Sequence, residues 1–160
     1  MDTFIIICAK YLILIPVLFF VWQFYILDKT NKRKMFWLSL CIFPIAYILA
    51  KLGSHLYMDP RPFVTSGIPP LIPHAADNGF PSDHMLLASS IASVVYIFSK
   101  KRGIVLFIVA LTIGFARVFA GVHHIKDILG SLLIAIFVTI IVYTLYNIWI
   151  QKKPSGSDQS

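Results

Sequence analysis

The sequence predicts an all-α, polytopic transmembrane helix bundle of about five membrane-spanning helices. Hydrophobic residues make up 58% of the 160 residues, and the mean hydropathy of +0.81 is unusual for a soluble domain. Five apolar runs are close to the roughly 17–25 residues that a membrane-spanning helix needs. Charged residues are few and gather between these runs. A soluble globular domain is therefore the less favoured fold class.

The first two apolar runs cover residues 4–27 and 35–52. The first predicts a retained helix and not a signal peptide, because the run is long and Asp2 stands where a basic start is expected. Pro16 lies inside this run and predicts a kink, since proline has no backbone N–H to donate. The second run is short, which predicts a helix with little tilt.

The other three runs cover residues 82–99, 103–119 and 127–150. Each is bounded by polar, basic or proline-containing segments, as expected for helices that end at a membrane surface. The loop between the second and third runs, residues 53–81, contains six prolines. Connections of this length are usually functional or disordered.

Basic residues are concentrated in the turns on one side of the predicted bundle. Nine of the fourteen lie there: Lys29, Lys32, Arg33, Lys34, Lys100, Lys101, Arg102, Lys152 and Lys153. By the positive-inside rule this side is cytoplasmic, so the N-terminus and the long loop are outside and the C-terminus is inside. Membrane orientation thus explains the net charge of +7, and we expect no nucleic-acid partner. One domain is predicted over residues 1–153, with a disordered cytoplasmic tail at 154–160.

Three short polar clusters interrupt the apolar sequence, and all of them fall at the predicted outer face. They are Arg61-Pro62, then Pro81-Ser82-Asp83-His84, then Arg117 with His123 and Asp127. Ionisable side chains cost about 2.5–3.5 kcal/mol each at a helix centre on insertion scales, so they usually mark function. Two arginines, two histidines and an aspartate are suited to binding a phosphate and breaking its ester or anhydride bond.

The third cluster indicates a histidine–aspartate pair. His123 and Asp127 are four positions apart, which on a helix places them on one face. An aspartate that binds one imidazole nitrogen leaves the other free as a nucleophile. His124, three positions before Asp127, permits the same pairing, and helix geometry does not decide between them. A histidine that merely caps a helix is the alternative.

The second cluster precedes a long apolar run. Ser82 is a suitable N-cap and Asp83 is favourable in a first turn, so a plain helix start is one interpretation. The functional interpretation is that free backbone N–H groups at this helix start bind a phosphate. His84 would then lie at the edge of the site, where it can protonate a leaving oxygen.

Prolines on both sides of Arg61 restrict its backbone, so its guanidinium is presented to phosphate oxygens with little freedom. A surface arginine that binds lipid head groups is the alternative. A metal site is the main chemical competitor, with four aspartates near several histidines: Asp59, Asp77, Asp83 and Asp127. Because no compact ligand motif appears, we expect no metal.

Together the clusters resemble the type 2 phosphatidic acid phosphatase (PAP2) superfamily over roughly residues 51–127. Its pattern is Lys, six residues, Arg-Pro; then Pro-Ser-Gly-His; then Ser-Arg, five residues, His, three residues, Asp. In this chain Arg61-Pro62 matches, Pro81-Ser82-Asp83-His84 nearly matches, and Arg117, His123 and Asp127 match in spacing. The resemblance favours His123 over His124.

The resemblance also implies roles. His123 would form a phosphohistidine intermediate, Asp127 would orient it, and His84 would protonate the leaving group. Phosphate binding would fall to two arginines and the start of a helix: Arg61, Arg117, Ser82 and the backbone of Asp83. No metal or other cofactor is implied.

Three positions depart from the family pattern. The family lysine would fall at Ser54, and Lys51, one helical turn earlier, is the candidate to replace it. Asp83 stands in place of glycine and adds a negative charge that disfavours phosphate unless it points away or bonds Arg61 or a histidine. The serine before Arg117 is Ala116.

Residues 59–64 and 72–85 resemble the bacterial undecaprenyl-diphosphate phosphatase branch of this superfamily. The implied substrate is a polyprenyl diphosphate released outside the cytoplasm by cell-wall synthesis, and the implied location is the bacterial cytoplasmic membrane. Phosphatidate, phosphatidylglycerol phosphate or a lipid A phosphate are alternative substrates. Phosphoryl transfer to another lipid, or lipid binding or transport without turnover, are alternative functions. His55 and His74 are expected to be ordinary loop residues.

Overall fold

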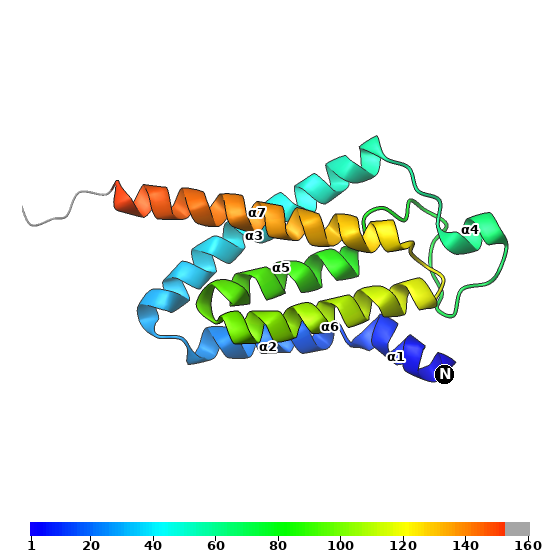
Figure 1. Ribbon diagram of the computed structural model, residues 1–160, viewed down its shortest axis with the longest axis horizontal. Helices are drawn as coiled ribbons and strands as arrows, with labels where there is room; N and C mark the ends of the chain where they lie inside the picture. The colour runs from blue at the N-terminus through cyan, green and yellow to red at the C-terminus, as the bar shows by residue number, and fades with distance from the viewer. Residues whose placement is uncertain (153–160) are drawn as a thin grey trace, which may run out of the picture.

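The computed structural model describes residues 1–152, and within them the chain forms seven helices joined by turns and one long loop (Figure 1). The helices are α1 (Asp2–Tyr11), α2 (Leu14–Ile26), α3 (Lys29–Leu56), α4 (Pro62–Ser66), α5 (Asp83–Phe98), α6 (Lys100–Phe119) and α7 (Ile125–Gln151). The predicted tail at 154–160 lies outside the described residues.

Helix α5 is the centre of the bundle. It packs against α2, α3, α6 and α7, and ten of its sixteen residues are buried. Two of its serines, Ser89 and Ser93, donate their hydroxyls to carbonyls one turn earlier, at 2.6 and 2.8 Å. These bonds satisfy the hydroxyls inside an apolar core and leave a narrow helix surface that its neighbours can approach.

Within the described residues, four helical segments are long and apolar enough to cross a membrane: Asp2–Ile26, Lys29–Leu56, Lys100–Phe119 and Ile125–Gln151. Their outer faces carry large exposed apolar side chains such as Leu18, Phe137 and Ile140. The fifth predicted span is α5, which has only 16 residues. The predicted all-α membrane bundle is therefore confirmed, and its central helix is shorter than each of the four membrane-spanning segments.

The first predicted span is divided into α1 and α2 by a break at Leu12 and Ile13. Pro16 has no N–H for the carbonyl of Leu12, one turn earlier. That carbonyl instead accepts the N–H of Ile15 at 3.0 Å. The predicted kink is thus a full break, and it lies one turn before the proline that explains it.

The two ends of the bundle differ in character. The turns that follow α2 and α5 and the end of α7 lie at one end, the left in Figure 1, and most of the basic residues lie beside them, at the starts of α3 and α6 and at Lys152. The loop containing α4 and the α6–α7 turn lie at the other end. The first residues of the predicted loop at 53–81 are helical, because α3 continues to Leu56. The side chain of Asn78 fixes this loop by donating to the carbonyls of Ser54 and Tyr57 at 2.7 and 2.9 Å.

Gly103 allows α6 to approach α5 closely where the two helices are joined. A Cβ here would meet backbone atoms of Tyr96, with the amide nitrogen 2.8 Å away. Because backbone atoms cannot rotate aside, Gly103→Ala should destabilise the fold by about 1–3 kcal/mol. The measurement is the thermal unfolding midpoint in detergent.

Gly53→Ala is the matched control for this substitution. Its Cβ would lie 3.4 Å from the Phe80 ring, which is an ordinary contact, so its unfolding midpoint should stay within about 2 °C of wild type. An unchanged unfolding midpoint in Gly103→Ala would contradict the close approach of α6 to α5 at this position.

Candidate active site

The three polar clusters meet at one cavity of about 310 Å³ at the loop end of the bundle. Residues from all three clusters line it: Arg61, Pro81, Asp83, His84, Arg117 and His123. They converge because α3 ends, α5 begins, α6 ends and α7 begins at this face of the molecule (Figure 1). This cavity is therefore the candidate active site.

The His123 ring is paired with Asp127. Its Nδ1 lies 3.2 Å from Oδ2 of Asp127, and the two residues are 2% and 0% exposed. Ser131, one turn further along α7, donates its hydroxyl to the carbonyls of Asp127 and Ser82 at 2.8 and 2.9 Å. These bonds join the start of α7 to the start of α5. If Asp127 accepts the Nδ1–H, Nε2 carries the lone pair that a nucleophile needs.

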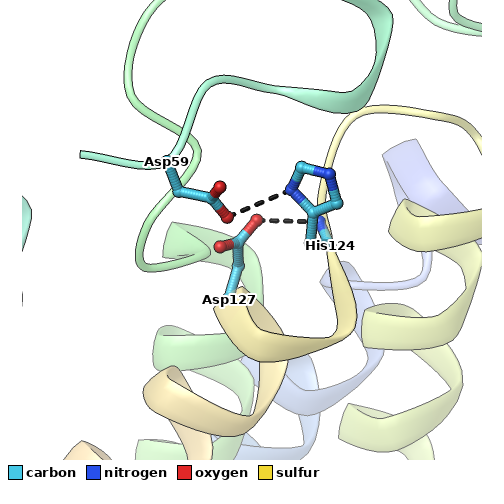
Figure 2. A group of neighbouring side chains, drawn as sticks. All are labelled: Asp59, His124 and Asp127. Carbon is cyan, nitrogen blue, oxygen red and sulfur yellow. Dashed lines mark hydrogen bonds and ion pairs between the residues drawn. The ribbon is translucent and has the colours of Figure 1, made fainter. Parts of the chain in front are cut away.

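His124, the rival in the spacing argument, has a different partner. Its Nδ1 lies 3.0 Å from Oδ2 of Asp59, while its backbone N–H donates to Oδ2 of Asp127 at 2.8 Å (Figure 2). The imidazole of His123 and the backbone of His124 therefore share one oxygen of Asp127. Of the two rings, that of His123 bonds Asp127 and lines the cavity.

Arg61 is 5% exposed and is held at several points. Its Nε donates to Asp77 Oδ1 at 2.7 Å, its Nη1 to the carbonyl of Val122 at 2.8 Å, and its Nη2 to that of Asn78 at 3.3 Å. Nη1 also lies 3.3 Å from Nε2 of His123. The guanidinium thus covers the lone pair of the histidine and keeps one Nη2 hydrogen for a ligand.

Arg117 and the start of α5 hold unsatisfied donors beside the cavity. Nη1 of Arg117 makes a long bond of 3.4 Å to the carbonyl of Ala9 in α1. Its buried Nε, and the buried hydroxyl of Ser82, have no partner among residues 1–152. Ser82 is the predicted N-cap of α5, yet its side chain caps no N–H. Buried unsatisfied groups beside a helix N-terminus suit an anion such as phosphate.

The remaining predicted site residues lie around the same cavity. His84 is half-buried in the first turn of α5. Asp83 is exposed and lies close enough to interact electrostatically with His84 and Arg117. In the described part of the chain, Asp83 forms no bond to Arg61 or to a histidine, the pairings that the sequence left open. Lys51 also lines the cavity, but its Nζ lies 5.1 Å over the Tyr47 ring.

Sequence reasoning missed several loop residues that belong to this site. His74, expected to be an ordinary loop residue, lines the cavity with its ring centroid 6.1 Å from that of His123. Asp77 positions Arg61, and Asn78 accepts the backbone N–H of Asp59 at 2.8 Å. The only signal in the sequence is the density of polar residues between His74 and Asn78 in a proline-rich loop.

Asp59, His124 and Asp127 offer ligand atoms that all lie within 4.8 Å of one another, so these three residues could hold a metal ion. The cluster already contains its own counter-charge, because Lys126 Nζ lies 2.9 Å from Oδ1 of Asp59 and His124 bonds Oδ2. The arginines supply the positive charge that a phosphate requires. We therefore derive no catalytic step from a metal here.

The sequence model of the PAP2 superfamily matches residues 34–151. This chain belongs to the PAP2 superfamily. It is 34% identical over 140 residues to undecaprenyl-diphosphatase BcrC of Bacillus subtilis strain 168, a match covering 86% of this chain and 71% of that protein. It is 31% identical over 147 residues to the bacitracin transport permease protein BcrC of Bacillus licheniformis, covering 84% and 72%.

Among solved structures, this PAP2 chain is similar to that of Aquifex aeolicus LpxE, with a TM-score of 0.70 at 28% identity. The match covers 89% of this chain and 85% of that one. Family membership and the membrane-spanning helices confirm the predicted family and the multi-pass membrane class. At this level the protein is a membrane PAP2 phosphatase.

The electrostatic environment in this PAP2 site favours a neutral His123. Burial lowers the pKa of the His123 ring, and the charges of Arg61 and Arg117 lower it further, against the opposing effect of Asp127. The ring is therefore unprotonated at neutral pH, which is the state required of a nucleophile.

We expect the acid limb of the kcat/KM profile, the fall in rate as the pH decreases, to be centred below about pH 6.5, the ordinary pKa of histidine. Protonation removes the lone pair of His123, and a lowered pKa moves that loss to more acidic pH. The test is a pH–rate profile in detergent, with kcat measured alongside to separate titration of the free substrate. An acid limb centred at pH 7 or above would contradict a neutral His123.

Proposed function

We propose that this membrane phosphatase hydrolyses undecaprenyl diphosphate to undecaprenyl phosphate through a phosphohistidine on His123. The observation that carries the proposal is the buried His123–Asp127 pair, which lies in one cavity with two arginines. The similarity to undecaprenyl-diphosphatase BcrC over 86% of the chain supports the choice of substrate. A polyprenyl diphosphate also suits a cavity at one end of a membrane bundle, because its lipid chain can remain among the helices.

In the first step Arg61, Arg117 and the start of α5 bind the terminal phosphate. Nε2 of His123 attacks its phosphorus while the bond to the bridging oxygen breaks. His84 gives a proton to that oxygen, and the lipid monophosphate leaves. The two arginines stabilise the charge on the equatorial oxygens of the transition state. For Nε2 to become available, the phosphate has to draw Arg61 Nη1 away from it.

In the second step water attacks the phosphohistidine. His84, now neutral, accepts a proton from the water, the P–N bond breaks, and inorganic phosphate leaves with His123 restored. Asp127 holds Nδ1–H through both steps and stabilises the positive charge that develops on the ring. Fixed donors of this chain supply the electrostatic stabilisation, so the proposed mechanism uses no cofactor.

The proposed orientation places the cavity and the N-terminus outside the cytoplasm and the C-terminus inside, in the cytoplasmic membrane of a bacterium. It rests on the distribution of charge, because most basic residues lie at the starts of α3 and α6, at the opposite end of the bundle from the loop containing α4 (Figure 1). A cysteine introduced by Ser66→Cys, at the exposed end of α4, should react with a membrane-impermeant maleimide in intact cells. Labelling only after lysis would contradict this orientation.

The substrate is tested by phosphate release from pure lipids in detergent with EDTA present. We expect kcat/KM to be highest for undecaprenyl diphosphate when it is compared with phosphatidate, phosphatidylglycerol phosphate and a lipid A phosphate. Preference for one of these monoesters would keep the chemistry and overturn the substrate. Label that appears in an acceptor lipid without free phosphate would show a phosphotransferase instead.

A second candidate is transport or binding of a phospholipid without turnover. It is favoured by the similarity to a protein named as a bacitracin transport permease. Binding would rest on the arginines and would leave no role for the His123–Asp127 pair. Retention of a labelled polyprenyl diphosphate by the purified protein, with no phosphate released, would support this candidate.

A further inference from the structure

We infer that Asp59 is a positioning residue, which couples the loop carrying Arg61 to the His123–Asp127 pair by way of His124 and Lys126. The inference deepens the phosphohistidine function proposed above and rests on it. Neither the resemblance nor the reaction steps assign a role to Asp59, His124 or Lys126. Their contacts nevertheless connect the phosphate-binding loop to the nucleophile.

The side chain of Asp59 is buried and reaches across to the start of α7. The residue is 4% exposed. One carboxylate oxygen lies 3.0 Å from Nδ1 of His124, and the other lies 2.9 Å from Nζ of Lys126. Lys126 also donates to the hydroxyl of Tyr57 at 3.0 Å. Both oxygens of Asp59 are therefore used by residues adjacent to the histidine–aspartate pair.

The contact continues from His124 to Asp127. The N–H of His124 donates to Oδ2 of Asp127 at 2.8 Å, and Oδ2 also accepts the bond from the His123 ring. The rotation of the Asp127 carboxylate therefore depends on where the backbone of His124 lies. Figure 2 shows the Asp59 and Asp127 carboxylates on the same side of the His124 backbone, with the His124 ring directed at Asp59.

The contact also continues from Asp59 to Arg61. The backbone N–H of Asp59 donates to Asn78 Oδ1, and its carbonyl accepts the N–H of Gly79, both at 2.8 Å. The carbonyl of Asn78 in turn accepts from Nη2 of Arg61 at 3.3 Å. The backbone that places the guanidinium and the side chain that anchors His124 thus belong to one fixed segment.

The charges of this cluster explain why an acid is needed at position 59. Nζ of Lys126 lies 2.9 Å from one carboxylate oxygen of Asp59, which is ion-pair distance. The Asp59 side chain thus pairs with Lys126 at one oxygen and with the His124 ring at the other. An asparagine would keep the shape and lose that attraction, which would leave the backbone of His124 free to shift. Displacements of about 1 Å can cost 10²-fold in rate when they misplace a reacting group.

The experiment measures kcat and KM on whichever lipid phosphate the wild type hydrolyses, together with the thermal unfolding midpoint. Asp59→Asn should lower kcat about 10- to 100-fold, the range known for residues that support a reacting side chain. KM should change less than about threefold, because the cavity keeps both arginines. Asp28→Asn, which changes an exposed aspartate that caps α3 at the opposite end, should leave kcat unchanged.

A double-mutant cycle tests whether Asp59 acts through His124. His124→Gln should lower kcat as well, and the double variant should lose little more than either single variant. Fully additive losses would overturn the inference, as would wild-type kcat in Asp59→Asn. If Asp59→Asn does not fold, Lys126→Met is measured instead, because Lys126 is exposed. Its kcat should fall in the same direction as that of Asp59→Asn, but by a smaller factor.

Two outcomes separate this inference from the proposed function and from a metal site. A wild type that hydrolyses no lipid phosphate would defeat the proposed function itself, whereas an active wild type with an equally active Asp59→Asn would defeat only the inference. The metal content of purified protein is measured after dialysis against Zn²⁺. Stoichiometric Zn²⁺ that is lost in Asp59→Asn, together with loss of activity in EDTA, would make the cluster a metal site and overturn the inference.

Discussion

Replacing His123 by alanine should reduce phosphate release about 10³-fold or more, because the variant lacks the atom proposed to attack phosphorus. Undecaprenyl diphosphate labelled in its terminal phosphate gives a direct test. Wild-type protein quenched in alkali should carry label as an acid-labile phosphohistidine, and His123→Ala should carry none. Binding should persist, since both arginines that line the cavity remain.

The control for this experiment is His55→Ala, which removes an exposed histidine near the end of α3. Its phosphate release should stay within about twofold of wild type, as is usual for surface substitutions. Equal release by His123→Ala and wild type would show that another group is the nucleophile. His84 and His74, the other imidazoles that line the cavity, would then be examined.

Arg117→Lys should lower kcat/KM about 10²-fold or more, even though it preserves the charge. The guanidinium presents a planar fork to phosphate oxygens, while lysine offers a single charged point. Arg117 is suited to this role because its buried Nε has no partner among residues 1–152 and its contact with Ala9 is long, at 3.4 Å. The loss should be measured at constant ionic strength on the preferred lipid.

Arg102→Lys is the matched control for Arg117→Lys. Arg102 lies at the opposite end of the bundle, where it donates to Gln23 at 2.9 Å and stacks 5.0 Å from the Trp22 ring. Its replacement should affect the unfolding midpoint more than kcat/KM. A wild-type kcat/KM in Arg117→Lys would show that this arginine does not bind the transferred phosphate.

The helices of the fold could be predicted because an apolar run of membrane length has few alternatives to a membrane-spanning helix. Their bounds could not. Helix α3 runs from Lys29 to Leu56, beyond the apolar stretch on both sides. At its first turn Asp28 acts as the cap, because its side chain accepts the backbone N–H groups of Thr30 and Asn31. A helix outside the hydrocarbon can include polar residues, so hydropathy does not mark its ends.

The short helix α4 was not predicted at all. Its five residues are too few for a hydrophobic period. The signals were local, with Pro62 at its first position and Gly67 just after it at φ +69°. Both belong to a loop with six prolines, where such signals are hard to separate from turns.

Spacing could predict that His123 and Asp127 lie close together, because helix geometry converts four positions into one face. It could not decide between His123 and His124, because the partner of the His124 ring is Asp59, which is 65 positions away along the chain. The bond between Arg61 and Asp77 likewise joins residues whose distance apart depends on the path of the loop. Contacts across loops depend on the folded chain, and one sequence does not reveal them.

The length of α5 bears on how deep in a membrane the candidate active site would lie. At 1.5 Å per residue, its 16 residues span about 24 Å, less than the roughly 30 Å of the hydrocarbon layer. Helices α3 and α7, with 28 and 27 residues, are much longer. An α5 centred in the hydrocarbon layer would start about 3 Å below its surface. From that position a lipid phosphate would reach the cavity from the side, and the polyprenyl chain of the proposed substrate would stay in the hydrocarbon layer.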